Sequence, residues 1–340
     1  MKKKGIKVID LFAGVGGLSL GFKAAGYDVV GAIDIDADCK KTYNLNYPNV
    51  NYICEDIRKL NTKDILKTFN VKKVDLIIGG PPCKGFSTIG ARSSSKIEIR
   101  KKFDERNYLF KDFVRVVDEI KPRVVLFENV SGFMSFNKGK VFELVKSSFQ
   151  DIGYEIESYL LDAVNFGVPQ FRKRVFIVAR KKNISEIGPP KKLSTKVKLK
   201  QMQTVKEAIS DLAGKEKQIS NHEPLNHGEK NIRRYKLIPE GGRLPEDKLS
   251  PDIYRRNFGN TFKRLDRKAP SLTMVPGHNA FPIHPWLNRS LTVREAARIQ
   301  TFPDNFIFTG NRQSQCLQVG NAVPVNLAAA WAFHLKRFLI

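Results

Sequence analysis

The sequence predicts an α/β protein built on a doubly wound, mostly parallel sheet, with a smaller loop-rich second domain. Three observations predict this architecture. Short apolar runs alternate with segments of helical spacing through the first half of the chain. A glycine-rich loop follows the first apolar run, at the sheet edge where open α/β sheets bind ligands. After residue 180 the alternation gives way to a Lys- and Pro-rich stretch without a steady period.

The elements of the first half follow one another in a repeated strand–helix order, which indicates parallel pairing. The predicted strands are the apolar runs 7–12, 28–34, 51–54, 74–80 and 123–130, with further strands at 155–163 and 174–180. The predicted helices between them are 17–26, 37–47, 62–70 and 107–120. We therefore expect a catalytic or ligand-binding domain over residues 1–180.

The second half has a different character. Residues 181–262 are polar, with short Gly/Pro punctuation, and predict a loop-rich domain whose closing segment reaches about residue 285. Residues 286–340 are expected to return to the first domain. Within them, Thr292 and Glu295 form the pattern of a capping box at a helix start. The apolar spacing of 320–339 predicts a final amphipathic helix.

The charge of the chain favours a polyanion as partner. The 340 residues carry a net charge of +25, which favours nucleic acid, with a solvated lysine-rich surface as the alternative. Residues 181–262 contain 18 Lys and Arg against 10 Asp and Glu, an excess of 8. The positive charge is therefore only mildly concentrated in the second domain.

The cysteines and the N-terminal segment indicate which cellular compartment and which kinds of site to expect. Cys39, Cys54, Cys83 and Cys316 are scattered, without zinc-like spacing or a His cluster, so we expect no metal and a reduced, cytoplasmic environment. The chain has no run of about eighteen apolar residues, so no membrane helix is predicted. Asp10 interrupts the first apolar run, which therefore predicts a strand and not a signal peptide.

The most informative segment is Pro81-Pro82-Cys83-Lys84, inside GGPPCKGFS (79–87). It follows a buried strand, so the cysteine is placed at the carboxyl end of that strand. Two prolines stiffen the approach and a following glycine permits a sharp turn. Such a cysteine is presented as a nucleophile, although a buried structural cysteine is also common.

The glycine-rich loop in DLFAGVGGLSLGF (10–22) joins the first strand to the first helix and permits a tight turn close to a ligand. Ser19 stands where the dinucleotide fingerprint needs glycine or alanine, which disfavours a nicotinamide or flavin cofactor. Asp34 ends the second strand, where an acid binds a ribose diol, and Asp56 follows the third. Without a P-loop lysine, the series predicts a nucleoside cofactor that lacks a pyrophosphate.

Taken together, these segments resemble the DNA (cytosine-5) methyltransferase family over nearly the whole chain and in the family's order. The matching motifs are DLFAGVGG for its S-adenosylmethionine loop, GGPPCKGFS for its catalytic loop, FENV (127–130) for its glutamate motif, QFRKR (170–174) for its paired arginines, and RLDRKAPSLT (264–273) and GNAVPVNLA (320–328) for its closing motifs. The resemblance implies a Rossmann-like, S-adenosylmethionine-dependent methyltransferase. One departure is Lys84, where glutamine is usual, which bears on a backbone contact near the target base and not on the chemistry.

The resemblance assigns catalytic roles. Cys83 is the nucleophile that adds to carbon 6 of cytosine, so that carbon 5 can attack the methyl sulfonium. Glu128 is the partner of cytosine N3, a role suited to a buried carboxyl with a raised pKa, with a capping or surface acid as the alternative. Arg174 holds the cytosine O2, and Arg172 supports the catalytic loop and the thiolate, whose pKa nearby cations lower. The period-2 spacing predicts that both arginines share one face of a strand.

The resemblance also implies a site for S-adenosyl-L-methionine, with S-adenosyl-L-homocysteine as the product. Asp34 takes the ribose hydroxyls and Asp56 the adenine amino group. Asn321 is expected to come from the final helix, which folds back to the first strand. A plain core position is the alternative for Phe12. The implied cofactor residues are Phe12, Gly14, Gly16, Asp34, Ile35, Asp56, Ile57, Pro82, Leu109 and Asn321.

A cytosine inside double-stranded DNA must be flipped out before a thiolate can reach it. The long, polar and basic stretch 87–107 is expected to be a mobile loop that closes over the flipped base, with a merely disordered loop as the alternative. Ser87 and Arg92 are candidates for phosphate contacts. Sequence recognition is expected from the second domain. Its candidate contacts are Arg233, Arg234, Arg243, Arg255 and Arg256.

Other classes of protein remain open at this point. A transfer-RNA-modifying branch shares these motifs but usually carries a late Cys-Phe-Thr element, whereas Cys316 is followed here by Leu317 and Gln318. A DNA-binding module that kept the fold, or a cofactor-binding structural protein, would not need the cysteine, glutamate and arginine pair. We expect a compact prokaryotic monomer that acts on the nucleoid in a restriction–modification system, without a stable complex with its restriction endonuclease.

Overall fold

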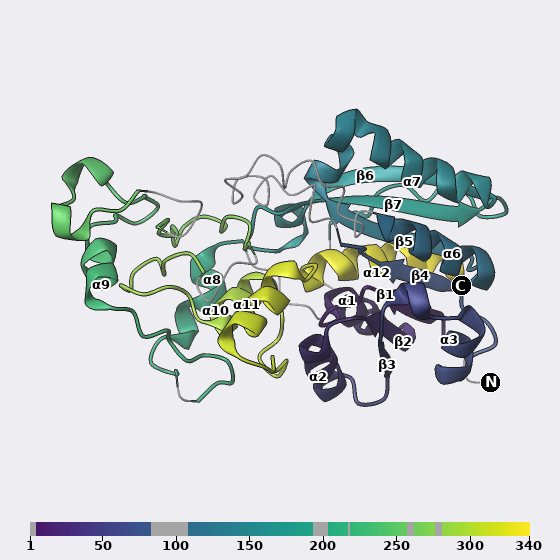
Figure 1. The fold of residues 1–340 in the computed structure, drawn as a ribbon, viewed down its shortest axis with the longest axis horizontal. Coiled ribbons are helices and arrows are strands. Elements are labelled where there is room, and N and C mark those ends of the chain that lie inside the picture. Colours follow the sequence, from purple (N-terminus) through teal and green to yellow (C-terminus); the bar gives the residue numbers. More distant parts are fainter. Residues whose placement is uncertain (1–4, 83–107, 193–202, 217, 257–261, 276–280) are drawn as a thin grey trace. The chain divides into compact units, whose positions relative to one another are not determined.

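The computed structural model describes residues 5–82, 108–192, 203–216, 218–256, 262–275 and 281–340. The chain divides into two compact units (Figure 1). Unit 1 consists of Met1–Asp162, Lys173–Lys192 and Ala328–Ile340, and unit 2 of Ala163–Arg172 and Leu193–Leu327. These units divide the chain at other residues than the expected boundaries at 180 and 286, because residues 163–172 and 286–327 group with unit 2.

Unit 1 contains a seven-stranded sheet in the order β3-β2-β1-β4-β5-β7-β6. The first five strands in this order are parallel, while β7 is antiparallel to both β5 and β6. This topology confirms the predicted doubly wound, mostly parallel fold. The strands are β1 (Lys7–Leu11), β2 (Asp28–Asp34), β3 (Asn51–Cys54), β4 (Leu76–Gly79), β5 (Val124–Val130), β6 (Tyr154–Asp162) and β7 (Lys173–Lys181).

The burial of the strands explains why they appear in the sequence as nearly continuous apolar runs. Strands β4 and β5 at the middle of the sheet are covered on both faces, so almost every side chain is buried. Strand β6 lies at the edge and alternates between half-buried and exposed residues, with Leu160 exposed. The central strands therefore carry the strongest sequence signal.

Helices cover both faces of this sheet (Figure 1). On one face lie α3 (Thr62–Thr68), α6 (Phe110–Ile120) and α7 (Lys140–Asp151). Their core includes edge-to-face contacts of Phe113 with Phe127 and Phe149. The opposite face carries α1 (Gly17–Ala24) and the part of α12 (Val325–Leu339) that belongs to unit 1. There Trp331 packs on Phe176 of β7, and α2 (Ala37–Asn46) packs against β3.

The end of the chain corrects one prediction. The expected helix 320–339 is interrupted: α11 (Arg312–Asn321) ends first, Ala322 is extended with ψ 145°, and α12 begins only at Val325. Pro324 has no backbone N–H and cannot continue a helix from the preceding turn. Asn321 therefore closes α11 in unit 2 and is not part of the final helix.

Unit 2 contains short helices connected by long loops. Besides α11, these are α8 (Val205–Ile209), α9 (Glu229–Lys236) and α10 (Val293–Ile299). The predicted capping box of Thr292 and Glu295 is confirmed at the start of α10, and Thr204 and Glu207 form a second one at α8. Around α9 lies a small apolar core of Tyr235, Ile238, Leu244, Phe262 and Ile283.

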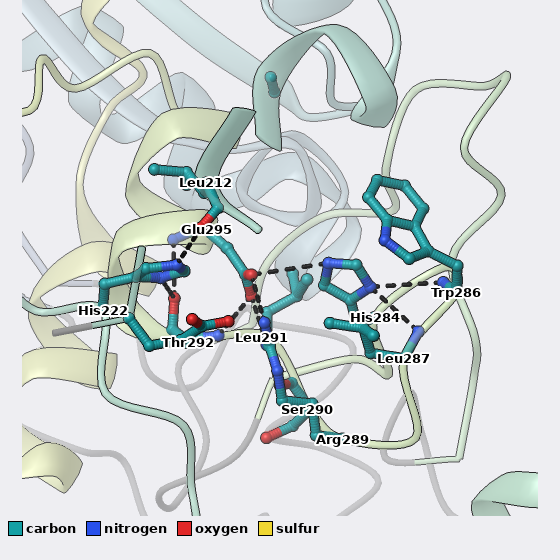
Figure 2. Close-up of polar contacts among 12 residues, drawn as sticks. Leu212, His222, His284, Trp286, Leu287, Arg289, Ser290, Leu291, Thr292 and Glu295 are labelled. Carbon is teal, nitrogen blue, oxygen red and sulfur yellow. Dashed lines mark hydrogen bonds and ion pairs between the residues drawn. The ribbon is translucent and has the colours of Figure 1, made fainter. Parts of the chain in front are cut away.

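A buried polar cluster holds the loops of unit 2 to α10 (Figure 2). The carboxylate of Glu295 accepts two hydrogen bonds from Arg289, at 2.7 and 2.8 Å, and lies 3.5 Å from His284 Nε2. His284 Nδ1 accepts from the backbone N–H groups of Trp286 and Leu287. Burial lowers the pKa of His284 to about 4, so Arg289 supplies the counter-charge to Glu295.

No helix in the described part of the chain is long and apolar enough to cross a membrane.

Candidate active site

The candidate site lies at the carboxyl edge of the parallel strands in unit 1. Strand β1 leads into the glycine-rich loop, β2 ends at Asp34, and Glu128 lies near the end of β5. Because parallel strands all present their carboxyl ends at one edge, these segments meet there. The sequence order of loop, acids and glutamate is thus converted into one ligand-binding edge.

The backbone turns abruptly where β1 ends. Phe12 has a left-handed φ of 57°, which is unusual for a residue with a side chain. Its half-buried ring stacks on Phe113 of α6 with the ring centroids 6.5 Å apart. Gly14 and Gly16 follow with φ of 54° and 84°. A Cβ on Gly14 would meet no atom within 4 Å, so the loop is open on that side.

Asp34 ties this loop to the end of β2. Its Oδ2 accepts a hydrogen bond from the Gly14 N–H at 2.9 Å, and its Oδ1 accepts from the Asp36 N–H at 3.0 Å. Burial raises the pKa of Asp34, while these hydrogen bonds lower it. The next residue, Ile35, is 67% exposed. The Asp34 carboxylate could accept hydrogen bonds from ribose hydroxyls, and the exposed Ile35 side chain could pack on the face of a purine.

Asp56 is more tightly engaged than the sequence suggests. Its carboxylate accepts from the backbone N–H of Arg58 and is paired with the Arg58 guanidinium at 2.6 Å. These hydrogen bonds hold its pKa low. Of the other expected cofactor residues, Ile57 is buried in the core, while Pro82 and Leu109 are half-buried in unit 1. Asn321 is exposed in unit 2.

Glu128 and Arg174 form an ion pair on adjacent antiparallel strands. Arg174 Nε lies 2.9 Å from Glu128 Oε1, and both side chains are almost buried. Burial lowers the pKa of Arg174, and the carboxylate opposes that shift. The pairing fixes the direction of the Glu128 side chain at the end of β5. The two residues that the sequence assigned to one base are therefore in direct contact.

The chain beyond β4 packs closely against this pair. A Cβ on Gly80 would lie 2.5 Å from Glu128 Oε2, so a larger residue there would displace the Glu128 carboxylate. Asn129 donates from Nδ2 to the Pro81 carbonyl at 3.3 Å. Sequence reasoning gave Asn129 no role, and its place beside Glu128 in FENV was the available signal. Cys83 follows within this segment but lies outside the described residues, as do Ser87, Arg92 and the whole expected loop 87–107.

Arg172 has a different setting from the one predicted. Strand β7 begins at Lys173, so Arg172 is not a strand residue and does not share a strand face with Arg174. Its buried guanidinium donates to the carbonyls of Met274, Gly320 and Ala322, at 2.7 to 3.0 Å. Within unit 2, Arg172 thus joins the residue directly after the motif 264–273 to the motif 320–328.

The candidate DNA contacts divide by exposure. Arg234 is buried, and its guanidinium donates to the Ile253 carbonyl and to Asn231. It is therefore a poor candidate, and we do not retain it. Arg233, Arg243, Arg255 and Arg256 are exposed. In the described part of the chain, no group of three metal-ligating side chains is found.

A Rossmann-like sheet with a glycine-rich loop after its first strand and an acid at the end of its second strand is typical of enzymes that bind a nucleoside-containing cofactor. The family model "C-5 cytosine-specific DNA methylase" matches residues 6–337. The chain therefore belongs to the C-5 cytosine-specific DNA methylase family, and it is a DNA (cytosine-5-)-methyltransferase.

Several known proteins are similar to this chain. The Type II methyltransferase M1.HphI of Haemophilus parahaemolyticus is 38% identical over 95% of this chain and 85% of its own length. M.DdeI of Desulfomicrobium norvegicum is 35% identical over 96% and 88%. The crystal structure of a putative DNA modification methyltransferase from an Escherichia coli prophage has a TM-score of 0.71 at 30% identity, covering 98% of this chain and 99% of that one. S. pombe Dnmt2, at 20% identity, a TM-score of 0.62 and coverage of 99% and 100%, shares the fold.

Proposed function

We propose that the chain methylates carbon 5 of a cytosine flipped out of double-stranded DNA, with Cys83 as the nucleophile. The Cys83 thiolate adds to carbon 6 and opens the double bond between carbons 5 and 6, while Glu128 meets cytosine N3 and Arg174 meets O2. After carbon 5 has gained the methyl group, loss of its proton restores the double bond and releases the Cys83 sulfur. The single observation that supports these roles is the nearly buried Glu128–Arg174 pair, with Gly80 packed against its carboxylate. The pair presents one carboxylate and one guanidinium to a base, matching the polar atoms at N3 and O2.

The proposed cofactor is S-adenosyl-L-methionine, which supplies the methyl group when bound. The residues fit a nucleoside. The Asp34 carboxylate keeps acceptor capacity for a ribose hydroxyl while it accepts from the backbone N–H groups of Gly14 and Asp36. Ile35 offers exposed apolar surface, and the open side of Gly14 permits close approach of a ligand. Because Asp56 is already paired with Arg58, we propose that it binds the adenine amino group in place of part of its contact with the Arg58 guanidinium.

The proposed nucleophile is tested with substitution and trapping. Cys83→Ser should abolish methyl transfer but retain S-adenosyl-L-homocysteine binding, because a hydroxyl is far less nucleophilic at neutral pH. Wild type should form a covalent complex with duplex DNA that contains 5-fluorocytosine, since fluorine replaces the proton that must leave carbon 5. Methyl transfer by the serine variant would overturn the assignment.

Sequence recognition is proposed for unit 2, through exposed arginines at base edges or phosphates. Arg233 is paired with Asp252 at 2.6 Å, and Arg255 lies over the Phe262 ring at 5.4 Å. Substitution of an arginine that contacts a phosphate should weaken binding to all DNA. It should also reduce the slope of log affinity against log salt concentration by about one for each lost contact. Substitution of an arginine that contacts a base should cost about 1–3 kcal/mol of binding free energy and relax the sequence preference at one position of the DNA site. Competition binding of single arginine variants at two salt concentrations separates these classes, and identical behaviour of all four would refute the proposal.

We also propose a biological setting. The similar Type II methyltransferases support the modification half of a restriction–modification system. The protein would act as a monomer on the nucleoid in a prokaryotic cytoplasm, without a stable complex with a cognate restriction endonuclease. Size-exclusion chromatography with light scattering tests the monomer, and a dimer would refute it.

A further inference from the structure

Three buried tyrosine hydroxyls donate hydrogen bonds to the glycine-rich loop or to the residues directly after it. Tyr47 donates to the Gly16 carbonyl at 2.8 Å, and Tyr52 donates to the Gly14 carbonyl at 3.2 Å. Tyr43 donates to Ser19 Oγ, just after the loop, at 2.9 Å. All three tyrosines are at least 92% buried, with exposures of 0%, 2% and 8% for Tyr43, Tyr47 and Tyr52. A buried hydroxyl needs a partner, and here each partner belongs to the loop or to the first turn of α1.

The three rings form one cluster fitted to the loop. Tyr43 of α2 and Tyr47, the residue directly after α2, have ring centroids 4.3 Å apart, and the ring centroid of Tyr52 of β3 is 4.9 Å from that of Tyr43. A Cβ on Gly16 would lie 2.6 Å from Tyr43 Cε2 and 2.9 Å from Tyr47 Cε2. The backbone of the loop at Gly16 therefore packs directly against the tyrosine rings, which leave no room for a side chain there.

Ser19 continues this support into the sheet. Its hydroxyl accepts from Tyr43 and donates to Asp10 Oδ2 at 2.6 Å. Asp10 and Ser19 are both fully buried. This explains why serine occupies the position where a dinucleotide fingerprint needs a residue without a hydroxyl. A chain of hydrogen bonds thus runs from α2 through α1 to β1.

We propose that Tyr47, Tyr52 and the Tyr43–Ser19–Asp10 chain are positioning residues, which hold the loop 14–16 in its cofactor-binding conformation. The inference rests on the proposed cofactor site. The loop has little intrinsic preference for this conformation, because glycines such as Gly14 and Gly16 have no Cβ and can adopt many backbone angles. Hydrogen bonds to its two carbonyls fix the peptide orientations before a ligand arrives, and a preorganised site loses less entropy on binding.

The test removes single hydroxyls and keeps the rings. Tyr47→Phe and Tyr52→Phe should each weaken S-adenosyl-L-homocysteine binding about fivefold by calorimetry, from the loss of one hydrogen bond. Ser19→Ala, which loses the bonds with both Tyr43 and Asp10, should weaken it by at least as much. In steady-state assays the KM for S-adenosyl-L-methionine should rise by a similar factor, with kcat nearly unchanged. The double variant Tyr47→Phe/Tyr52→Phe should bind more weakly than either single variant.

Tyr154→Phe is the matched control. Tyr154 is buried in unit 1 and donates to the Pro122 carbonyl at 2.8 Å, the same distance as the Tyr47 bond, but it does not contact the loop. It should lower the unfolding temperature as Tyr47→Phe does and leave S-adenosyl-L-homocysteine affinity unchanged. Equal affinity of wild type and all three loop variants would overturn the positioning role while leaving the cofactor site intact. A wild type that binds no S-adenosyl-L-homocysteine would instead overturn the cofactor site, and the inference with it.

Discussion

Replacing Asp10 by asparagine should change how the stability of the protein depends on pH. Asp10 is fully buried on β1, and burial raises its pKa from 3.8 to about 7, against the lowering effect of its hydrogen bond with Ser19. Among the described residues, its Oδ1 has no hydrogen-bond partner. Between these two pKa values the folded state therefore holds a proton that the unfolded state has released.

The sign and size of the effect follow from proton linkage. Where the folded state binds more protons, the free energy of unfolding falls as pH rises, and this loss is complete above the folded pKa of about 7. Each pH unit between the two pKa values changes the free energy of unfolding by about 1.4 kcal/mol. Titration of Asp10 should therefore lower the free energy of unfolding of wild type by about 3 kcal/mol between about pH 5 and pH 8. The amide introduced by Asp10→Asn does not titrate, so the variant lacks this loss.

The assay is urea unfolding of wild type and Asp10→Asn at pH 5, 6, 7 and 8. The free energy of the variant minus that of wild type should increase with pH and level off above about pH 7, because other titrating groups largely cancel in the difference. Asp28→Asn, at an exposed position at the start of β2, controls for the acid-to-amide change itself. A difference that stays flat from pH 5 to 8 would refute a neutral, protonated Asp10.

Three further substitutions test the packing of the site and of unit 2. Gly16→Ala should lower the free energy of unfolding by about 2 kcal/mol, because φ is 84° and the new Cβ would lie 2.6 Å from Tyr43; a change below about 0.5 kcal/mol in urea unfolding would contradict this. Glu128→Gln should cost about 3 kcal/mol in the same assay, since it leaves Arg174 buried without a counter-charge, and unchanged stability would argue against the ion pair. Glu295→Gln should cost about as much, and a neutral result would mean that its paired arginine is solvated.

The sequence predicted the sheet well because its central strands are buried on both faces. The observed β2 and β3 coincide with the predicted ranges 28–34 and 51–54, and each other strand differs by at most two residues at either end. Helix α7 (Lys140–Asp151) was not predicted, although Val141, Val145 and Phe149 show helical spacing. The apolar pattern of the final helix continues across Pro324, so periodicity alone predicts a helix that is too long.

The site was predictable in its residue types but not in their pairings. The period-2 spacing of QFRKR predicted two arginines on one strand face, yet Arg174 pairs with Glu128 while Arg172 binds carbonyls about 100 and 150 residues away. Such long-range partners leave no local pattern. The tyrosine cluster was also missed, because Tyr43 and Tyr47 at helical spacing fit an ordinary core face, and their hydroxyl partners depend on where α2 packs.

The central claim is that this chain methylates cytosine in DNA through Cys83, and bisulfite sequencing tests it most directly. Wild type and Cys83→Ser should be expressed in a bacterial host that lacks cytosine methylation, and host DNA sequenced after bisulfite conversion. The account predicts 5-methylcytosine at one short sequence context with wild type and none with the serine variant. Unmethylated DNA with folded wild type, methylation confined to RNA, or methylation that persists in Cys83→Ser would contradict it.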